Sequence, residues 1–144
     1  MLMLSRINQN GKEEILLQKR KNTGYMDGYW DFSASGHVEE NESMKMATIR
    51  ETKEELGIDV KIENVEPICI IHKNIGLTYY NGYFKTTKWS GEPKVNEPEK
   101  CEEIRWFNID DLPENMIDDR IVAVQNYKNN IYYSEYGWEN KEGE

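Results

Sequence analysis

The chain is poor in cysteine and lacks any long apolar run. Cys69 and Cys101 are its only cysteines, and their spacing matches no CxxC or Cys/His zinc site, so both are interpreted as reduced structural thiols. The apolar run at residues 68–71 is far too short to cross a bilayer. Residues 1–4 lack the charged and apolar regions of a signal peptide. These absences predict a cytoplasmic protein without a membrane segment.

Positive charge is also scarce. The 144 residues include 27 acidic and 18 basic side chains, which gives a formal net charge of −9. A general nucleic-acid surface normally needs a basic patch, so no extended surface of that kind is expected. An acidic protein can still bind a polyphosphate when metal ions bridge the two sets of negative charge and a few cations lie nearby.

Turn residues and alternating apolar positions divide the chain into short elements. A turn at residues 8–11 predicts a hairpin of strands 1–8 and 13–20, and a loop at 22–28 precedes a strand at 29–33. Further strands are predicted near 58–64 and 67–73, at 77–89 with a bulge at Asn81-Gly82, and at 104–107. Residues 90–100 are expected to form a surface loop, residues 118–128 a second helix, and residues 131–144 a tail of no clear structure. The order of elements predicts one α+β domain over residues 1–144.

The first helix is predicted at residues 44–56. Ser43 is a suitable N-cap, the segment contains no glycine or proline, and Gly57 is the usual residue just beyond a helix end. These signals fix both ends of the helix from local sequence.

Glu51, Glu54 and Glu55 share one narrow arc of this helix. At about 100° per residue, Glu54 lies about 60° to one side of Glu51 and Glu55 about 40° to the other. Like charges at this spacing oppose helix formation by about 0.2–0.5 kcal/mol per pair, which indicates that a cation is expected there. Mg²⁺ typically takes a few carboxylates, several waters and substrate phosphates. The alternative interpretation is a solvated acidic face.

A wider pattern favours the metal site. Glycine and acidic or basic residues stand at fixed spacing across residues 36–58: Gly36, Glu42, Arg50, Glu51, Glu54, Glu55 and Gly57. This pattern resembles the Nudix box of the MutT-like hydrolases. Two positions depart from it, because Thr52 stands where the family prefers a bulky aliphatic residue and Ser35 where many members have the first of two glycines.

The resemblance implies a Nudix-type α/β/α sandwich with a mixed sheet between helices. It also implies hydrolysis of the diphosphate linkage of a nucleoside triphosphate, damaged ones included, or of another nucleoside diphosphate derivative, with Mg²⁺ or Mn²⁺ as cofactor. The expected partner is a small-molecule nucleotide, and a homodimer is left open. Two other functions stay open: a catalytically silent nucleotide-binding sensor domain and an RNA 5′-end pyrophosphatase.

The resemblance further assigns metal ligands. They are the backbone at Ser35 and Gly36 and the carboxylates of Glu51, Glu54, Glu55 and Glu97. Glu97 belongs to the predicted loop at 90–100, where a solvated loop acid is the alternative because several other glutamates are nearby.

Catalytic and substrate roles follow from the same resemblance. Glu51 is the expected general base, with a glutamate of a later loop as the alternative because family members differ on this point. Glu54 acts beside it, and Arg50 is expected to orient a neighbouring glutamate. Glu42 and Gly57 are expected to brace the box. Arg20 is the candidate for phosphate contact, and the alternative for this cation is solubility at a strand end. By residue type, Trp30 and Phe84 could stack on a base, and the alternative for these rings is core packing.

Overall fold

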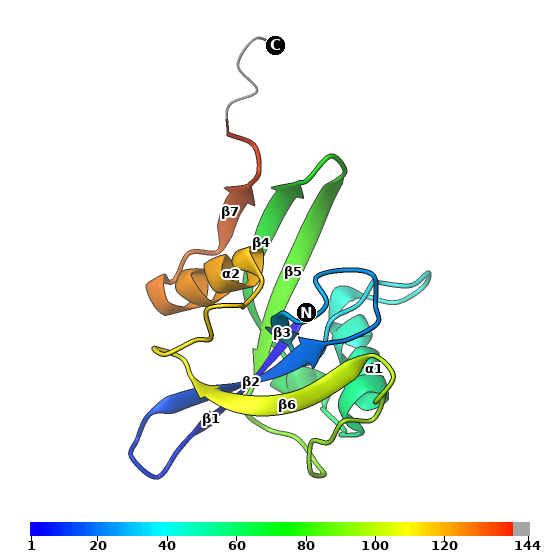
Figure 1. Cartoon of the computed structure of the whole chain (residues 1–144), viewed down its shortest axis with the longest axis vertical. Helices are drawn as coiled ribbons and strands as arrows, with labels where there is room; N and C mark the ends of the chain where they lie inside the picture. Colours follow the sequence, from blue (N-terminus) through cyan, green and yellow to red (C-terminus); the bar gives the residue numbers. More distant parts are fainter. Residues whose placement is uncertain (140–144) are drawn as a thin grey trace.

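The computed structural model describes residues 1–139 and shows a mixed sheet with a helix on each face (Figure 1). The strands are β1 Leu2–Ile7, β2 Glu13–Arg20, β3 Trp30–Phe32, β4 Glu66–Asn74, β5 Thr78–Thr86, β6 Cys101–Asn108 and β7 Tyr133–Tyr136. The helices are α1 Met44–Leu56, the short 3-10 helix η1 Ile62–Asn64, and α2 Asp118–Asn129. No helix within residues 1–139 has the length and apolar character needed to span a membrane. The predicted α+β class with a mixed sheet between two helices is confirmed.

The strand order places one end of the sheet beside α1. The sheet runs β3-β2-β1-β5-β4-β7, and β6 pairs with β2. The pairs β1–β5 and β4–β7 are parallel, and the other pairs are antiparallel. β2, the segment that follows β3, and β5 border one opening together with α1.

Each face of the sheet has its own apolar core. On the α2 side, Ala123 and Val124 pack with Ile71 and Tyr83 of the sheet. On the α1 side, the fully buried residues include Leu2, Leu4, Leu16, Leu56 and Ile58. Burying these side chains on two faces stabilises the sandwich and holds α1 firmly against the sheet.

Helix α1 begins and ends where the sequence predicts. The Ser43 side chain accepts a hydrogen bond from the backbone N–H of Met46, and Gly57 ends the helix with a left-handed φ of 71°. Thr52, at the position where the Nudix box prefers a bulky aliphatic residue, is fully buried, and its hydroxyl donates to the carbonyl of Thr48. A small side chain is therefore accommodated on the buried face of this helix.

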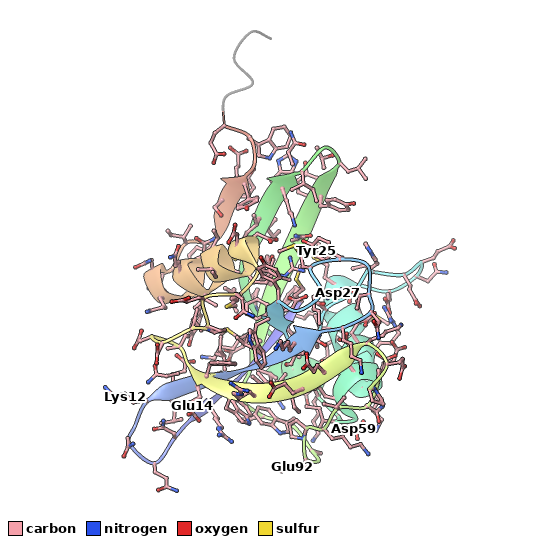
Figure 2. All side chains as sticks on the ribbon, viewed as in Figure 1. Lys12, Glu14, Tyr25, Asp27, Asp59 and Glu92 are labelled. Carbon is pink, nitrogen blue, oxygen red and sulfur yellow. The ribbon has the colours of Figure 1, made fainter. Side chains whose placement is uncertain are left out.

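Two predictions about the middle of the chain are wrong. Residues 58–64 do not form a strand, because the buried Ile58 and Val60 pack under α1 while Asp59 alone bridges to Ser90, and the segment then enters η1. Asp59 and Glu92 are labelled in Figure 2, and Glu92 belongs to the loop after β5 that also contains Ser90. The alternation of apolar and polar residues in this segment therefore reflects which side chains are buried, and it does not indicate a strand of the sheet.

The predicted bulge at Asn81-Gly82 is also absent from β5. Gly82 pairs regularly with Ile70, and the register shift lies instead in β4, between Pro67 and Cys69. A Cβ on Gly82 would lie 2.6 Å from Met44 Sδ. The glycine therefore allows α1 to approach the sheet closely.

The tail predicted without clear structure includes the strand β7 in its described residues. β7 adds in parallel to the edge of β4. Of the tail predicted at 131–144, residues 140–144 lie outside the described part.

Candidate active site

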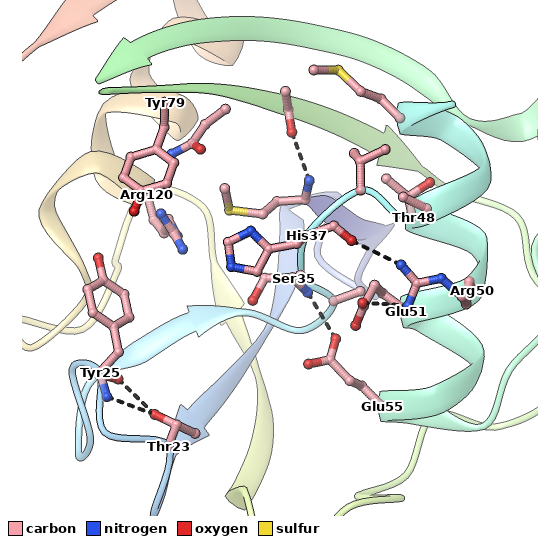
Figure 3. Close-up of a pocket in the computed structure, with 18 of the residues that line it drawn as sticks. Thr23, Tyr25, Ser35, His37, Thr48, Arg50, Glu51, Glu55, Tyr79 and Arg120 are labelled. Carbon is pink, nitrogen blue, oxygen red and sulfur yellow. Dashed lines mark hydrogen bonds and ion pairs between the residues drawn. The ribbon is translucent and has the colours of Figure 1, made fainter. Parts of the chain in front are cut away.

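A cavity of about 1020 Å³ lies between α1, the loop that follows β3, the β2–β3 loop and the first residues of β5. Its volume is at the upper end of what small-molecule sites occupy. Figure 3 shows Glu51, Glu55 and Arg50 of α1 on one wall, with Tyr79 and Arg120 across the cavity. The predicted box residues therefore face Tyr79 of β5 and Arg120 of α2 across one cavity.

Arg50 ties the acidic helix to the preceding loop. Its Nη2 donates to Glu42 Oε1 at 2.6 Å and to the His37 carbonyl at 3.0 Å, and its Nε donates to Glu42 Oε2 at 3.1 Å. Its Nη1 donates to Glu51 Oε1 at 2.7 Å and, more weakly, to Glu54 Oε2 at 3.4 Å. One guanidinium thus braces the loop through Glu42 and orients Glu51.

Gly36 allows the closest approach in the site. A Cβ at this position would lie 2.3 Å from the Glu51 carboxylate. Burial raises the pKa of Glu51, and Arg50 offsets this only in part. The Glu51 carboxylate is therefore partly desolvated and lies between the Arg50 guanidinium and the backbone of Gly36.

Glu55 is the most strongly perturbed carboxyl of the helix. It accepts a hydrogen bond of 2.9 Å from the backbone N–H of Ser35. Burial nevertheless raises the pKa of Glu55 to about 8, and the charge of Glu51 adds to the effect. A desolvated carboxyl beside another carboxyl is unlike a plain solvated acidic face.

The loop that contains Glu97 is held against the end of α1 by Asn96. The Asn96 side chain donates to the carbonyl of Glu54 at 2.9 Å, and its backbone N–H donates to the carbonyl of Glu55 at 3.1 Å. Glu97 therefore lines the cavity, and its charge contributes to the raised pKa of Glu51. Nothing in the local sequence distinguished Asn96 as this anchor.

The substrate candidates differ in how the structure places them. Arg20 lines the cavity. Its Nε donates a hydrogen bond to the Tyr25 carbonyl at 2.7 Å, and its Nη1 donates to Asp31 at 2.9 Å. Phe84 lies on the cavity floor but is only 8% exposed, so little of its ring is open to a ligand.

Trp30 requires a correction. The sequence analysis proposed it for stacking on a base, but its ring is 5% exposed and belongs to the core on the α2 side. One contact is the edge of Phe107 at a centroid distance of 4.9 Å, and the Arg105 guanidinium covers the ring at 5.1 Å. The side chain already has its packing partners, so no face remains for a base.

A buried charge network at the far wall was not predicted. Arg120 of α2 donates to Asp31 at 2.8 Å and to Asp119 at 2.7 Å, and Lys73 of β4 also donates to Asp119, at 3.1 Å. Tyr25, on the loop after β2, accepts from Lys73 and is labelled in Figure 2. In this buried network the charges of Arg120 and Lys73 are paired with carboxylates. Arg120 and Lys73 both also line the cavity.

Comparison with known proteins identifies the class to which this geometry belongs. The NUDIX domain family matches residues 3–126. The chain belongs to the Nudix family. The box at residues 36–58 and the sandwich around it are therefore those of a Nudix domain.

Curated relatives share parts of this Nudix chain. An uncharacterised Nudix hydrolase of Listeria innocua is 36% identical over 72 residues, which cover 49% of this chain and 43% of that protein. An 8-oxo-dGTP diphosphatase of Proteus vulgaris is 39% identical over 79 residues, which cover 54% of this chain and 68% of that protein. The chain thus spans less than half the length of the Listeria relative.

Solved structures agree on the fold. A MutT Nudix hydrolase of Burkholderia pseudomallei superposes with a TM-score of 0.72 at 29% identity, covering 87% of this chain and 94% of the other. The Nudix domain of Shewanella oneidensis NrtR, solved with ADP ribose, gives a TM-score of 0.71 at 14% identity, covering 90% and 84%. The second likeness concerns the fold alone.

The donor set of the Nudix box fits a hard divalent ion. Glu51, Glu54, Glu55 and Glu97 offer carboxylate oxygens, which suit Mg²⁺ and Mn²⁺, and the missing Cβ of Gly36 leaves the adjoining backbone open. Within residues 1–139, no three acidic, histidine or cysteine side chains already converge on one point. Glu51 is turned to Arg50 and Glu55 to Ser35, so a metal would draw these carboxylates from their present partners.

Gly36→Ala tests the close approach directly. The added methyl group would collide with the end of the flexible Glu51 side chain and push its carboxylate away from the loop. We expect turnover to fall at least tenfold while the melting temperature changes little, because misplacement by about 1 Å is enough to cost this much rate. Steady-state kinetics and thermal melts of both proteins measure the two effects. Unchanged turnover would show that the position of Glu51 does not matter.

Proposed function

We propose that this Nudix domain is a metal-dependent pyrophosphohydrolase that cleaves the diphosphate linkage of a nucleoside triphosphate or another nucleoside diphosphate derivative. The observation that carries the proposal is the arrangement around Arg50, which holds Glu42, Glu51 and Glu54 and the His37 carbonyl at one edge of the cavity. A merely solvated acidic helix has no need of such a network. The relative from Proteus vulgaris, named as an 8-oxo-dGTP diphosphatase, supports the same reaction class.

The metal would be held by oxygen ligands already at the site. These are Glu51, Glu54, Glu55, Glu97 and the backbone carbonyls at Ser35 and Gly36. When bound, the ion supplies charge neutralisation on the phosphoryl oxygens and a lowered pKa for water. In the present structure the Glu51 and Glu54 carboxylates share the Nη1 of Arg50 as their cationic partner.

Glu51 is proposed as the general base. Its raised pKa brings the carboxylate closer to the range in which it can accept a proton near neutral pH. It would take the proton of a water whose oxygen bonds to phosphorus as the bridging oxygen of the diphosphate leaves. Arg50 keeps that carboxylate in one orientation, so less reorganisation is needed during the reaction.

Substrate phosphates would lie between α1 and the cations across the cavity. Arg20 is the proposed phosphate contact, since it lines the cavity and is fixed by Asp31 and the Tyr25 carbonyl. A fixed cation offers attraction without a large loss of side-chain entropy on binding. This geometry allows binding of a polyphosphate by a protein whose net charge is −9.

A substrate panel tests the proposal. Nucleoside triphosphates, nucleotide sugars and capped RNA are incubated with Mg²⁺ or Mn²⁺, and products are resolved by chromatography. We expect at least one nucleoside triphosphate to give a monophosphate and pyrophosphate, and a chelator to abolish the reaction. Absence of turnover across the panel with either metal would reject the enzyme and favour a sensor. Turnover of capped RNA alone would favour the RNA-end function.

The contributions of individual ligands can be ranked. Glu54→Gln removes a carboxylate at the end of the Arg50 network, so we expect a weaker metal affinity, about tenfold or more, with activity partly restored at high metal. Glu97→Gln should cost less, because Glu97 belongs to a loop and not to the helix that contains the other three carboxylates. The matched control is Glu99→Gln, an exposed glutamate of the same loop that does not line the cavity. Metal titrations of turnover measure all three, and wild-type behaviour of Glu54→Gln would contradict the assignment.

A further inference from the structure

Arg120 is a buried guanidinium held rigidly from two sides. It is 6% exposed, and its partners Asp31 and Asp119 are 0% and 2% exposed. Nε donates to Asp31 at 2.8 Å, and Nη1 donates to Asp119 at 2.7 Å and to the Tyr83 hydroxyl at 3.4 Å. Because these contacts fix the plane of the guanidinium, the position of its remaining nitrogen is fixed too.

That remaining nitrogen, Nη2, has no acceptor among residues 1–139 within hydrogen-bond distance. Ser33 Oγ is the only fully enclosed side-chain polar atom in the described part that lacks a partner. Nη2 must therefore touch the cavity that Arg120 lines. Figure 3 shows the guanidinium between Tyr79 and Tyr25, with its nitrogens toward the interior of the cavity.

The surroundings make this end of the cavity rich in hydrogen-bond donors. Lys73 contacts Asp119 and the Tyr25 hydroxyl, and it is 5% exposed. The rings of Tyr25 and Tyr79 border the same space. Aromatic rings beside a fixed donor suit a flat polar ring system such as a nucleobase.

We propose that Arg120 Nη2 reads an acceptor oxygen on the base of the substrate, so that oxo bases are preferred to their amino counterparts. The inference rests on the proposed function, since a nucleotide whose phosphates lie along α1 would extend its base toward the opposite wall. A guanidinium has only donors, so a carbonyl oxygen completes its hydrogen bonding. An amino group at the same position brings donor against donor and leaves both groups unpaired in a buried place.

A neutral acceptor fits this position better than a phosphate. Arg120 and Lys73 supply two positive charges at this end of the cavity, and Asp31 and Asp119 balance both of them. A doubly charged phosphate would therefore have to approach two buried carboxylates across a short distance. A carbonyl oxygen is uncharged, so it is not repelled in this way by the two carboxylates.

The first test uses the wild-type protein without metal, so that it does not depend on catalysis. Isothermal titration compares inosine with adenosine monophosphate and uridine with cytidine monophosphate, pairs that differ by an oxo or an amino group. We expect the oxo member of each pair to bind about 10- to 100-fold more tightly, as one buried unpaired donor requires. Equal binding, or tighter binding of the amino members, would overturn the inference.

The second test substitutes Arg120 itself. Arg120→Lys keeps the positive charge that Asp31 and Asp119 need but removes Nη2, and we expect the preference to fall to about twofold or less. Lys128→Gln is the control, because Lys128 lies on the same helix and pairs with Asp110 outside the cavity. Tripolyphosphate, which has no base, should bind the wild type and Arg120→Lys equally. Loss of tripolyphosphate binding in the variant would make Arg120 a phosphate contact and overturn the inference.

The two proposals fail separately. Oxo preference in binding without any turnover would reject the hydrolase and keep the role of Arg120. Turnover with equal binding of oxo and amino bases would reject the role of Arg120 and keep the hydrolase. If Arg120→Lys does not fold, the wild-type titrations still decide.

Discussion

Glu51→Gln is expected to lower kcat by about 10²–10⁴-fold at saturating metal, the range that removal of a general base produces. The substitution keeps the size of the side chain and allows Arg50 to retain Glu42 and the His37 carbonyl as partners. What it removes is the proton acceptor. The loss should therefore persist when metal is raised, unlike the loss in Glu54→Gln.

The measurement is kcat against metal concentration for both proteins. Glu40→Gln serves as a control, because Glu40 is exposed in the loop before α1 and does not line the cavity. If kcat of Glu51→Gln recovered fully at high metal, Glu51 would be a ligand only and another group would be the base.

Stability of the metal-free protein should depend on pH through Glu55. Its pKa is raised to about 8 by burial, so between about pH 4.5 and 8 the folded protein holds a proton that the unfolded chain has lost. The contribution of Glu55 to the free energy of unfolding therefore falls as pH rises, by up to about 1.4 kcal/mol per pH unit in that window. Below about pH 4.5 the contribution is constant.

The effect must be isolated from a second group that acts in the opposite sense. Burial lowers the pKa of the Met1 amino group to about 5, so its contribution to stability rises with pH over much of the same range. The difference between wild type and Glu55→Gln removes most of the Met1 contribution; burial is the main cause of the Met1 shift, and the charge of Glu55 is a smaller one. Denaturant unfolding at several pH values measures this difference. As pH rises from 5 to 8, the free energy of unfolding of the variant should increase relative to that of the wild type. A difference independent of pH would mean that Glu55 is ionised in the folded protein.

The parts of this site that the sequence predicted are local in the chain. Ser43 and Gly57 fix the ends of α1, and the spacing of Glu51, Glu54 and Glu55 follows from the helical repeat. Capping and periodicity act within a few residues, so they are readable without any knowledge of the tertiary structure. The hairpin of β1 and β2 was predicted for the same reason.

The parts that were missed depend on distant contacts. Asp31 and Arg120 are 89 positions apart, and no local pattern links them. The role of Asn96 exists only because its loop returns to the end of α1. Trp30 was assigned to the site by residue type, whereas its position in the sheet decides that it is buried. Tertiary packing determines these three outcomes.

The central claim is that the acidic arc of α1 is a metal site and not a solvated face. Thermal melts of wild type and Glu55→Gln, with Mg²⁺ and with Na⁺ at matched ionic strength, test it most directly. An ion that binds only the folded protein should stabilise the wild type by about 2.7 kcal/mol at a hundredfold excess over Kd, and the variant much less. A small response to Mg²⁺ that equals the response to Na⁺ and is the same in both proteins would contradict the claim.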